Sequence, residues 1–257
     1  MDVKTVRALV EREIVTVALD NIDSTNAEAK RIAPRLYEAG DLVPRLIVAK
    51  EQSAGRGRMG RSFLSRANRG VFMSLVYFTD KPLADVVSIT TAAAAIVAVA
   101  IEKVTHKSMR IKWVNDIYND KGKVCGILTE TVPVSKDTVA VVVGIGINIG
   151  ADEFPDELRD IASSIGDIEG KEELLVAEIV GGLLKHSDIP EDNSYMSEYR
   201  KRFMLNGMDV NVLRDGEVVG SGRVLGVDDR GGLLLMPDGE SEPVSVHSGE
   251  VSVRAKR

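Results

Sequence analysis

The sequence predicts an α+β protein, in which a mixed β-sheet flanked by helices is followed by a small all-β barrel. Up to about residue 205, apolar strand-like runs alternate with stretches whose apolar residues recur at helical spacing. Beyond that point, short β runs are separated by turn signals at Asp215-Gly216, 229–232 and Asp238-Gly239. Regularly spaced turns of this kind are typical of a small antiparallel barrel. We therefore expect a large domain over 1–205 and a barrel domain over 206–257.

Composition narrows the class of protein. The 257-residue chain is 44% hydrophobic and 28% charged, which is ordinary for a soluble globular protein. Its net charge of −6 argues against a protein built to coat nucleic acid. Cys125 is the single cysteine, so no internal disulfide can form, and we expect a cytoplasmic protein. The N-terminus lacks the apolar core of a signal peptide, and the longest apolar run, Ala92–Ile101, is shorter than the roughly 20 residues of a membrane span. We expect this run to be a buried helix.

In the first part of the chain, strands alternate with helices. Residues 2–13 carry apolar side chains at helical spacing and predict a short amphipathic helix. A second helix starts within Asp23-Ser-Thr-Asn26, with Thr25 and Glu28 as a capping box, and Pro34 ends or kinks it. The other expected elements are strands over 15–19, 46–50 and 70–78, and a long helix from Pro82 to about Val104.

The next part begins with two short strands around a polar break, within Arg110–Tyr118. A hairpin turn at Asn119–Gly122 leads to a return strand, Lys123–Glu130, whose apolar neighbour is Thr138–Ile149. Three helices are expected after these strands, near 156–164, over 172–186 and near 194–204.

The most distinctive stretch is Gly55-Arg-Gly-Arg-Met-Gly-Arg61, which we call the arginine loop. Its glycines let the backbone approach a ligand, and Arg56, Arg58 and Arg61 are cations suited to phosphate or carboxylate. We therefore expect an anion-binding loop that becomes ordered around its ligand, although a solvated turn is the alternative. The glycine spacing also matches a dinucleotide fingerprint, but that motif needs a helix directly after it, and a strand follows here.

Polar residues interrupt the apolar strands at a few positions. Asn115 and Asp116 could bind phosphate and magnesium, or form an Asx-type turn. Lys123 could stabilise charge that develops on phosphorus, or protect a strand edge. Gly126 marks a close approach by a ligand or by other backbone. Asn148 could recognise a base or a ribose.

Other polar or reactive residues give weaker signals. Phe63 could stack on an aromatic base, or simply anchor its loop. The three histidines share no metal-ligand spacing, so we expect no zinc site. Cys125 is expected to be a buried core thiol.

The order of these motifs resembles the biotin–protein ligase family. The segments that carry the resemblance are Ser24–Asn26, Glu51–Arg61, Lys112–Asp116, Lys123–Leu128 and Gly144–Asn148. The missing upstream DNA-binding domain resembles the monofunctional form of the family. The resemblance implies a catalytic domain like that of class II aminoacyl-tRNA synthetases and biotin ligases, with an SH3-like C-terminal barrel.

The resemblance also implies an activity. Biotin and ATP would be the substrates and would form biotinyl-5′-AMP, from which biotin passes to a lysine of a biotin carboxyl carrier protein. It implies magnesium, no permanently bound cofactor, a homodimer, and binding to neither DNA nor membrane.

The implied roles follow the matching positions. Catalysis would fall to Lys123, Arg58 and Asp116, with Asp116 also holding magnesium. Biotin would be bound by Ser24, Thr25, Asn26, Gln52, Gly55, Arg56, Gly57, Arg58, Lys123 and Gly126. ATP or the adenylate would be bound by Arg58, Arg61, Phe63, Lys112, Trp113, Asn115, Asp116, Lys123 and Asn148. Two positions depart from the family, because Val114 replaces a proline and Phe63 replaces a tryptophan.

Two other functions are compatible with parts of this pattern. A lipoate or octanoate ligase would share the catalytic fold but lack an intact arginine loop. A non-enzymatic nucleic-acid-binding module would use the arginine loop and the barrel. The net charge of −6 and the 4% aromatic content disfavour this second alternative.

Overall fold

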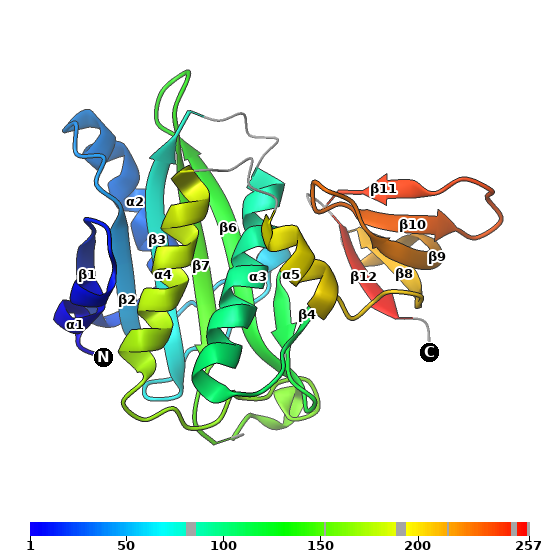
Figure 1. The fold of residues 1–257 in the computed structure, drawn as a ribbon, viewed down its shortest axis with the longest axis horizontal. Coiled ribbons are helices and arrows are strands. Elements are labelled where there is room, and N and C mark those ends of the chain that lie inside the picture. Colours follow the sequence, from blue (N-terminus) through cyan, green and yellow to red (C-terminus); the bar gives the residue numbers. More distant parts are fainter. Residues whose placement is uncertain (81–85, 152, 189–193, 215, 248–250, 256–257) are drawn as a thin grey trace.

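The computed structural model describes residues 1–80, 86–151, 153–188, 194–214, 216–247 and 251–255 (Figure 1). These residues form two sheets. The large sheet has seven strands in the order β1-β2-β3-β7-β6-β5-β4, and the small sheet has five in the order β11-β10-β9-β8-β12. Only β1 and β2 pair in parallel among these strands, so the large sheet is mixed and the small one antiparallel. The predicted α+β class is confirmed, whereas the SH3-like form of the small sheet stays a prediction.

The elements of the first part are α1 (Val3–Leu9), β1 (Val15–Ile22), α2 (Thr25–Glu38), β2 (Arg45–Gln52), β3 (Gly70–Thr79), α3 (Val86–Thr105), β4 (Arg110–Lys112), β5 (Asp116–Tyr118), β6 (Lys123–Pro133) and β7 (Val139–Asn148). Those that follow are α4 (Glu172–Asp188), α5 (Ser194–Arg202), β8 (Asp209–Arg214), β9 (Glu217–Val227), β10 (Leu233–Pro237), β11 (Val244–Val246) and β12 (Val251–Ala255). Short 3-10 turns lie at Arg58–Gly60 and Asp156–Leu158.

The two faces of the large sheet are covered by different helices. Because successive strand residues point to opposite faces, Leu46, Met73 and Val143 share a core with α1, α3, α4 and α5. Figure 1 shows α3, α4 and α5 lying across the front of this sheet. Ile47 and Val142 belong to the other face, where they pack against Ala29 and Ala33 of α2, together with other small apolar residues. The start of α2 is therefore held over the opposite face from the helical layer.

Helix α3 is the buried apolar helix that the sequence predicts. Its window Ser88–Thr105 is long and apolar enough to cross a membrane by length and composition alone, yet 61% of that window is buried inside the protein. Alanines 92–95 are 0–1% exposed, which allows close packing against the sheet. The predicted start at Pro82 lies outside the described residues.

Cys125 lies at the centre of the same core. Its side chain is fully buried, and burial raises the pKa of its thiol. The expectation of a core thiol is confirmed.

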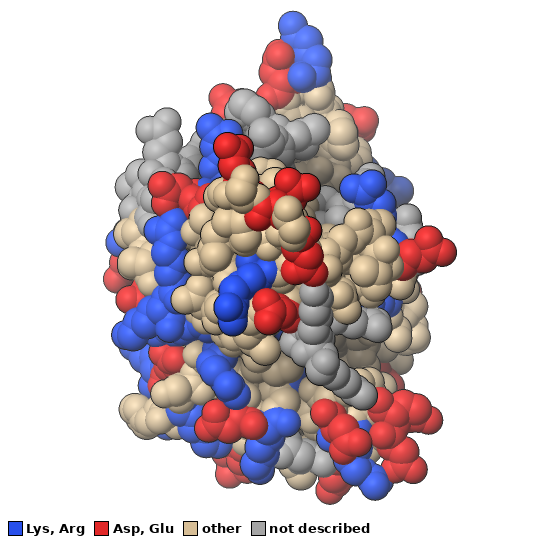
Figure 2. Space-filling model, turned by 90° about the vertical axis from the view of Figure 1, so that its right-hand side faces the viewer, with Lys and Arg blue, Asp and Glu red and all other residues tan. Residues whose placement is uncertain are grey.

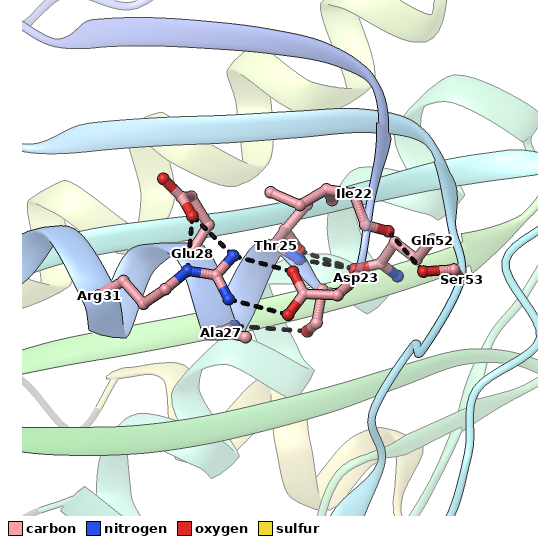
Figure 3. Close-up of polar contacts among 9 residues, drawn as sticks. Ile22, Asp23, Thr25, Ala27, Glu28, Arg31, Gln52 and Ser53 are labelled. Atoms are coloured by element: carbon pink, nitrogen blue, oxygen red, sulfur yellow. Dashed lines mark hydrogen bonds and ion pairs between the residues drawn. The ribbon is translucent and has the colours of Figure 1, made fainter.

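The predicted capping box at Thr25 and Glu28 is wrong by one residue. Ser24 is the N-cap, with extended backbone and an Oγ that accepts a hydrogen bond from the Ala27 amide at 3.4 Å. Thr25 is already helical, and its amide donates to Gln52 instead (Figure 3). Pro34 does not end the helix, which continues to Glu38.

The predicted helix near 156–164 is also wrong. The only helical turn in the described part of this stretch is Asp156–Leu158. The backbone beyond it runs beside the ends of the sheet strands, where the Ser163 amide donates to Lys123 O at 2.8 Å and the Ile165 amide donates to Asn148 O at 3.0 Å. Pairing with the sheet therefore overrides the helical preference of this segment.

A buried ion pair holds α3 to α5. Arg202 is 8% exposed and contacts Glu102 at 2.5 Å as well as Glu198. Glu102 also accepts a hydrogen bond from the Met109 amide at 2.8 Å, so it fixes the turn between α3 and β4. Burial alone would raise the pKa of Glu102, but the hydrogen bonds from Arg202 and Met109 outweigh it and leave the pKa below its ordinary value.

We predict that Glu102→Gln lowers the free energy of unfolding by about 1–3 kcal/mol, because it leaves buried Arg202 with only the more exposed of its two carboxylate partners, Glu198. Since the pKa of Glu102 is depressed, its contribution is complete above the ordinary carboxyl value and is lost as pH falls through the lowered one. Urea denaturation from pH 7 to pH 3 should show the two proteins converging in acid. Glu178→Gln, which breaks the more exposed pair with Lys103, is the control and should cost less than about 1 kcal/mol. Equal losses in the two variants would contradict the prediction.

Candidate functional site

A cavity of about 170 Å³ opens where the start of α2 and the arginine loop face the sheet. It lies on the sheet face opposite the helical layer. It is lined by Ser24, Thr25, Asn26, Gln52, Arg56, Gly57, Arg58, Met59, Arg61, Ser62, Phe63, Met73, Lys112, Trp113, Asn115, Asp116, Lys123, Gly126, Ile127, Leu128, Gly144, Ile145 and Gly146. Nearly all the residues that the sequence singles out are therefore brought together, and the exceptions are Gly55 and Asn148.

The floor of the cavity is bare backbone. Gly126 of β6 lies directly opposite Gly146 of β7, and Gly144 follows on the same face of β7. A Cβ on Gly144 would lie 2.0 Å from Oδ1 of Asn26, and one on Gly146 would lie 2.5 Å from the ring of Phe63. The sequence left open whether these glycines serve packing or a ligand. In this structure they admit Asn26 and Phe63.

One end of the cavity is a chain of uncharged polar groups. Oε1 of Gln52 accepts from the Thr25 amide at 2.8 Å and lies 3.1 Å from the Thr25 hydroxyl (Figure 3). Oγ of Ser74 lies 2.7 Å from Oγ1 of Thr25 and 2.5 Å from Oδ1 of Asn26. Nε2 of Gln52 donates to Oγ of Ser65 at 2.8 Å, which fixes the orientation of its amide.

The Asn26 amide is oriented from its other side. Its Nδ2 donates to Leu128 O at 3.1 Å and to Glu130 at 2.9 Å, and both partners can only accept. Lys30 pairs with the second oxygen of Glu130 at 2.5 Å. Oδ1 of Asn26 must therefore accept the hydrogen of the Ser74 hydroxyl. The result is a fixed set of amides and hydroxyls at the start of α2.

The start of α2 is also tied down from the solvent side. The Arg31 guanidinium forms two hydrogen bonds of 2.8 Å with the Asp23 carboxylate and contacts Glu28 (Figure 3). The hydrogen bonds from Arg31, and to a smaller extent the one from the Ser24 amide, hold the pKa of Asp23 well below its usual range. The ion pairs brace the turn that presents Ser24 to the cavity.

The arginine loop folds back as a tight hairpin. The Gly57 amide donates to Arg61 O at 2.7 Å, and the Phe63 amide donates to Gly55 O at 2.9 Å. A Cβ on Gly55 would lie 2.4 Å from Phe63 O, so this glycine serves the hairpin rather than the cavity lining. No helix follows the loop within the described residues before β3, which agrees with the rejection of a dinucleotide fingerprint.

The arginines of this loop differ in direction. Arg56 and Arg61 are exposed, whereas Arg58 turns inward and donates to Oδ1 of Asn115 at 3.2 Å. Burial lowers the pKa of the Arg58 guanidinium, and the charge of Asp116 opposes that shift. The loop therefore places one cation inside the cavity and two at its mouth.

Phe63 covers the glycine floor. Its ring packs against Gly146 and Gly126 and meets the edge of Phe72, with 6.4 Å between ring centroids. Nζ of Lys123 lies 5.9 Å from the Phe63 centroid. A flat ring thus lies on the bare backbone between the two polar ends of the cavity.

The other end of the cavity is charged. Nζ of Lys123 lies 2.8 Å from Oδ1 of Asp116, and their side chains are 26% and 24% exposed. Asn115 is held beside them, because its Nδ2 donates to Ile127 O at 2.7 Å and the Ile127 amide donates back to Asn115 O at 3.0 Å. Together with Arg58 and Lys112, this end carries more positive than negative charge.

The structure places Asn148 outside this cavity. Its amide donates to Ser163 O at 2.9 Å, and it lines a small neighbouring pocket with Leu64, Arg66 and Arg69. The predicted contact between Asn148 and an adenine therefore stays a prediction.

Asp116 is the candidate metal ligand of the cavity. Asp116 is the single carboxylate among the described residues that line the cavity. No group of three or more His, Cys, Asp or Glu side chains suited to a metal occurs in the described part of the chain. Magnesium is usually held by one or two carboxylates together with substrate phosphates and water. The donor set therefore fits a magnesium ion brought by a nucleotide.

Sequence reasoning missed Ser74 and Glu130, which orient the predicted residue Asn26. Ser74 is fully buried and is the single polar side chain within the apolar run Val71–Phe78 other than the Tyr77 phenol. A lone hydroxyl in a buried strand must find a partner, and that signal could have identified it.

Comparison with known proteins connects this cavity to a family. The family model described as "Biotin/lipoate A/B protein ligase family" matches residues 20–148, and the one described as "Biotin protein ligase C terminal domain" matches residues 207–254. The bifunctional ligase/repressor BirA of Bacillus spizizenii is 34% identical over 233 residues, which cover 84% of this chain and 67% of that protein. The biotin–[acetyl-CoA-carboxylase] ligase of Mycobacterium tuberculosis is 28% identical over 244 residues, covering 91% of this chain and 88% of the relative.

A solved structure has the same fold. The biotin protein ligase of Aquifex aeolicus, in complex with biotin and ATP, superposes with a TM-score of 0.72 at 28% identity. The match covers 94% of this chain and 99% of that one.

We predict that Phe63→Ala exposes the arginine loop to trypsin, because the ring fixes the loop on the glycine floor. Cleavage after Arg56, Arg58 and Arg61 should become about tenfold faster, which corresponds to about 1.4 kcal/mol of lost packing. Mass spectrometry of timed digests measures the rate at each bond. Phe78→Ala, a partly buried phenylalanine of β3 far from the loop, controls for general loss of stability. Unchanged cleavage in Phe63→Ala would show that the ring does not hold the loop.

Proposed function

The chain belongs to the biotin/lipoate A/B protein ligase family, and we propose that it acts as a biotin protein ligase. It activates biotin with ATP and then transfers the biotinyl group to a lysine of a biotin carboxyl carrier protein. One observation carries the proposal. A neutral end of amides and hydroxyls is joined across a glycine floor to an end that carries several cations.

The neutral end favours biotin over lipoate or octanoate. The ureido ring of biotin has one carbonyl acceptor and two N–H donors. Ser24, Thr25 and Gln52 can complement these groups, and Ser24 accepts from Ala27 without using its own hydroxyl hydrogen. The dithiolane ring of lipoate and the alkyl chain of octanoate cannot form hydrogen bonds with these polar groups. Each polar group left unpaired would weaken binding by about 1–3 kcal/mol.

The charged end is suited to adenylation. A carboxylate oxygen of biotin attacks the α-phosphorus of ATP, the bond from that phosphorus to the bridging oxygen breaks, and pyrophosphate leaves. Lys123 and Arg58 would stabilise the negative charge that builds up on the phosphoryl oxygens, and in a partly buried site such charges act strongly. Arg56 and Arg61 at the mouth can bind the departing pyrophosphate. We assign adenylate contacts also to Lys112, Trp113, Asn115 and Asp116, all of which line this end.

Magnesium is proposed to arrive with ATP. Asp116 would supply its carboxylate, and Asn115 would hold a phosphate oxygen or a metal-bound water. When bound, the ion neutralises phosphate charge. Asp116 also keeps Lys123 extended over the floor by their 2.8 Å ion pair.

The second step needs no nucleophilic side chain from the ligase. The amine of the carrier lysine attacks the acyl carbon of biotinyl-5′-AMP, the carbon–oxygen bond of the mixed anhydride breaks, and AMP leaves. Closure of the arginine loop would protect the anhydride from water. We propose that a carrier domain is the acceptor, since relatives are named biotin–[acetyl-CoA-carboxylase] ligases.

Several predictions from the sequence and from the family resemblance stay proposals. These are a homodimer, a cytoplasmic location, ligase activity without a repressor function, and domains over 1–205 and 206–257. The alternative of a nucleic-acid-binding module is not favoured. In the face that Figure 2 shows, lysines and arginines are interspersed with acidic side chains.

We predict that ATP–pyrophosphate exchange, in the presence of magnesium, depends on biotin. Biotin, lipoate and octanoate are supplied in parallel, because exchange reports adenylation without needing an acceptor. Exchange with biotin alone is the expected result. Exchange with lipoate or octanoate instead of biotin would show that the protein is a lipoate or octanoate ligase of the same fold. A folded protein that exchanges with none of the acids would refute ligase function.

We predict that Lys123→Ala lowers biotin-dependent exchange by at least about 100-fold, because it removes the cation that we propose to stabilise charge on the reacting phosphate. Lys121→Ala, which removes an exposed lysine two residues away, is the matched control and should keep wild-type exchange. Circular dichroism and thermal melting would verify that both variants are folded. Near-normal exchange in folded Lys123→Ala would remove this residue from catalysis.

A further inference from the structure

The turn at Asp228–Gly232, between β9 and β10 of the small sheet, rests on the catalytic part of the chain. Nε1 of Trp113 donates to the carbonyl of Gly231 at 2.9 Å, in a buried hydrogen bond that joins residues 118 positions apart. Arg200 of α5 pairs with Asp229 and donates to Val227 O at 3.3 Å. The turn therefore touches both the Lys112–Asp116 segment and α5.

Gly231 fits this place because it has no side chain. Its φ is +82°, and a Cβ would lie 2.7 Å from Cγ2 of Thr91 on α3. Both the backbone conformation and the contact with α3 thus exclude larger residues. The carbonyl of Gly231 is held at a fixed distance from the catalytic elements.

Asp228 fixes the shape of the turn. Its Oδ1 accepts from the amides of Arg230 and Gly232, both at 2.8 Å. Its other oxygen binds the hydroxyl of Ser245, next to β10 in the sheet. Burial would raise the pKa of Asp228, but these hydrogen bonds outweigh it and lower the pKa, so the carboxylate is charged at neutral pH.

On the other side of the contact, Trp113 itself lines the charged end of the cavity, where Asn115 and Asp116 follow it. Its side chain is 4% exposed. The next carbonyl, Val114 O, accepts from the buried hydroxyl of Tyr199 at 3.1 Å. Asn115 is bonded to Ile127, as described above. Between Lys112 of β4 and Asp116 of β5, the backbone is therefore held by α5, by β6 and by the small sheet.

We propose that the Asp228–Gly232 turn positions Asn115 and Asp116 for ATP through the hydrogen bond between Trp113 and Gly231. Asp228 is then a positioning residue that acts through Trp113, which itself lines the site, and the small sheet is a working part of the nucleotide site. This inference rests on the proposed ligase function. It concerns the charged end of the cavity, because the biotin end is built from α2, β2, β3 and β6 and has no described contact with the turn.

The test uses four single variants of the full chain and one double variant, which combines Trp113→Phe with Asp228→Ala. Trp113→Phe removes the indole N–H but keeps an aromatic ring. Asp228→Ala loosens the turn from a distance, and Asp228→Asn keeps a carbonyl oxygen for the two amides. Asp238→Ala is the control, since Asp238 binds Ser221 at another turn of the same sheet. Each variant is assayed by ATP–pyrophosphate exchange with biotin, with ATP and biotin varied separately.

We expect Asp228→Ala to raise the KM for ATP about tenfold, the effect of one lost buried hydrogen bond, with the KM for biotin unchanged. Asp228→Asn should restore most of the loss, and Asp238→Ala should behave as wild type. Trp113→Phe should resemble Asp228→Ala, and combining the two should add little, because both act through one hydrogen bond. A wild-type KM for ATP in Asp228→Ala, or an equal rise for ATP and biotin, would overturn the proposal.

Fluorescence separates this result from failure of the ligase function. Trp113 is the single tryptophan of the chain, so emission reports on this contact alone. Asp228→Ala should shift the emission to longer wavelength and increase quenching by acrylamide, and Asp238→Ala should not. An unchanged spectrum in Asp228→Ala would refute the contact whatever the activity. If the spectrum of Asp228→Ala is altered but the wild-type protein shows no exchange with any acid, the contact is supported and the ligase function is refuted.

Discussion

The site depends on one constraint, the absence of side chains where β6 pairs with β7. At Gly126, Gly144 and Gly146 the sheet presents only backbone, and each missing Cβ gives room to a named neighbour. The start of α2 can approach the sheet because Gly144 accommodates Asn26. Phe63 can cross from the arginine loop to the sheet because Gly146 accommodates its ring. The cavity is thus a consequence of strand pairing, and the polar and charged groups are arranged around it.

Those groups are sorted by charge along the cavity. Thr25, Asn26, Gln52 and Ser74 form a neutral network in which the Asn26 amide is oriented by partners that only accept, Leu128 O and Glu130. Lys123, Asp116 and Arg58 gather at the other end. A substrate with a neutral polar ring and an anionic tail can satisfy both ends at once. In the proposed function, this separation lets one cavity hold a vitamin head group and activate its carboxylate.

Most of the fold could be predicted because its signals are local. Apolar runs marked the strands of the large sheet, and a break was expected at Asn115 and Asp116, whereas the structure has it at 113–115 and begins β5 at Asp116. The predictions were wrong where tertiary contacts determine the local structure. Ser24 rather than Thr25 caps α2, because the amide and hydroxyl of Thr25 are hydrogen-bonded to Gln52 at the end of β2. The segment after Asp156 pairs with strand ends instead of forming a helix.

The site shows the same division between local and long-range information. The arginine loop, Lys123 and the polar break were identifiable by residue type and spacing. The partner of Trp113 lies 118 residues away in another sheet, and no local pattern indicates it. Val114 replaces the proline that the family resemblance led us to expect, and the structure holds this segment instead through Tyr199, Ile127 and Gly231. Pairings of this kind follow from how the elements pack.

The buried position of Cys125 has a practical consequence for labelling. The thiolate is the reactive form of cysteine, and burial in this core both shields the sulfur and keeps it protonated. Because the chain has no other cysteine, its folded form offers alkylating dyes and spin probes almost nothing to modify. A cysteine introduced at an exposed position, such as Met59 of the arginine loop, would be labelled selectively without first removing the native one. The closing of the loop could then be followed spectroscopically in a protein whose core is untouched.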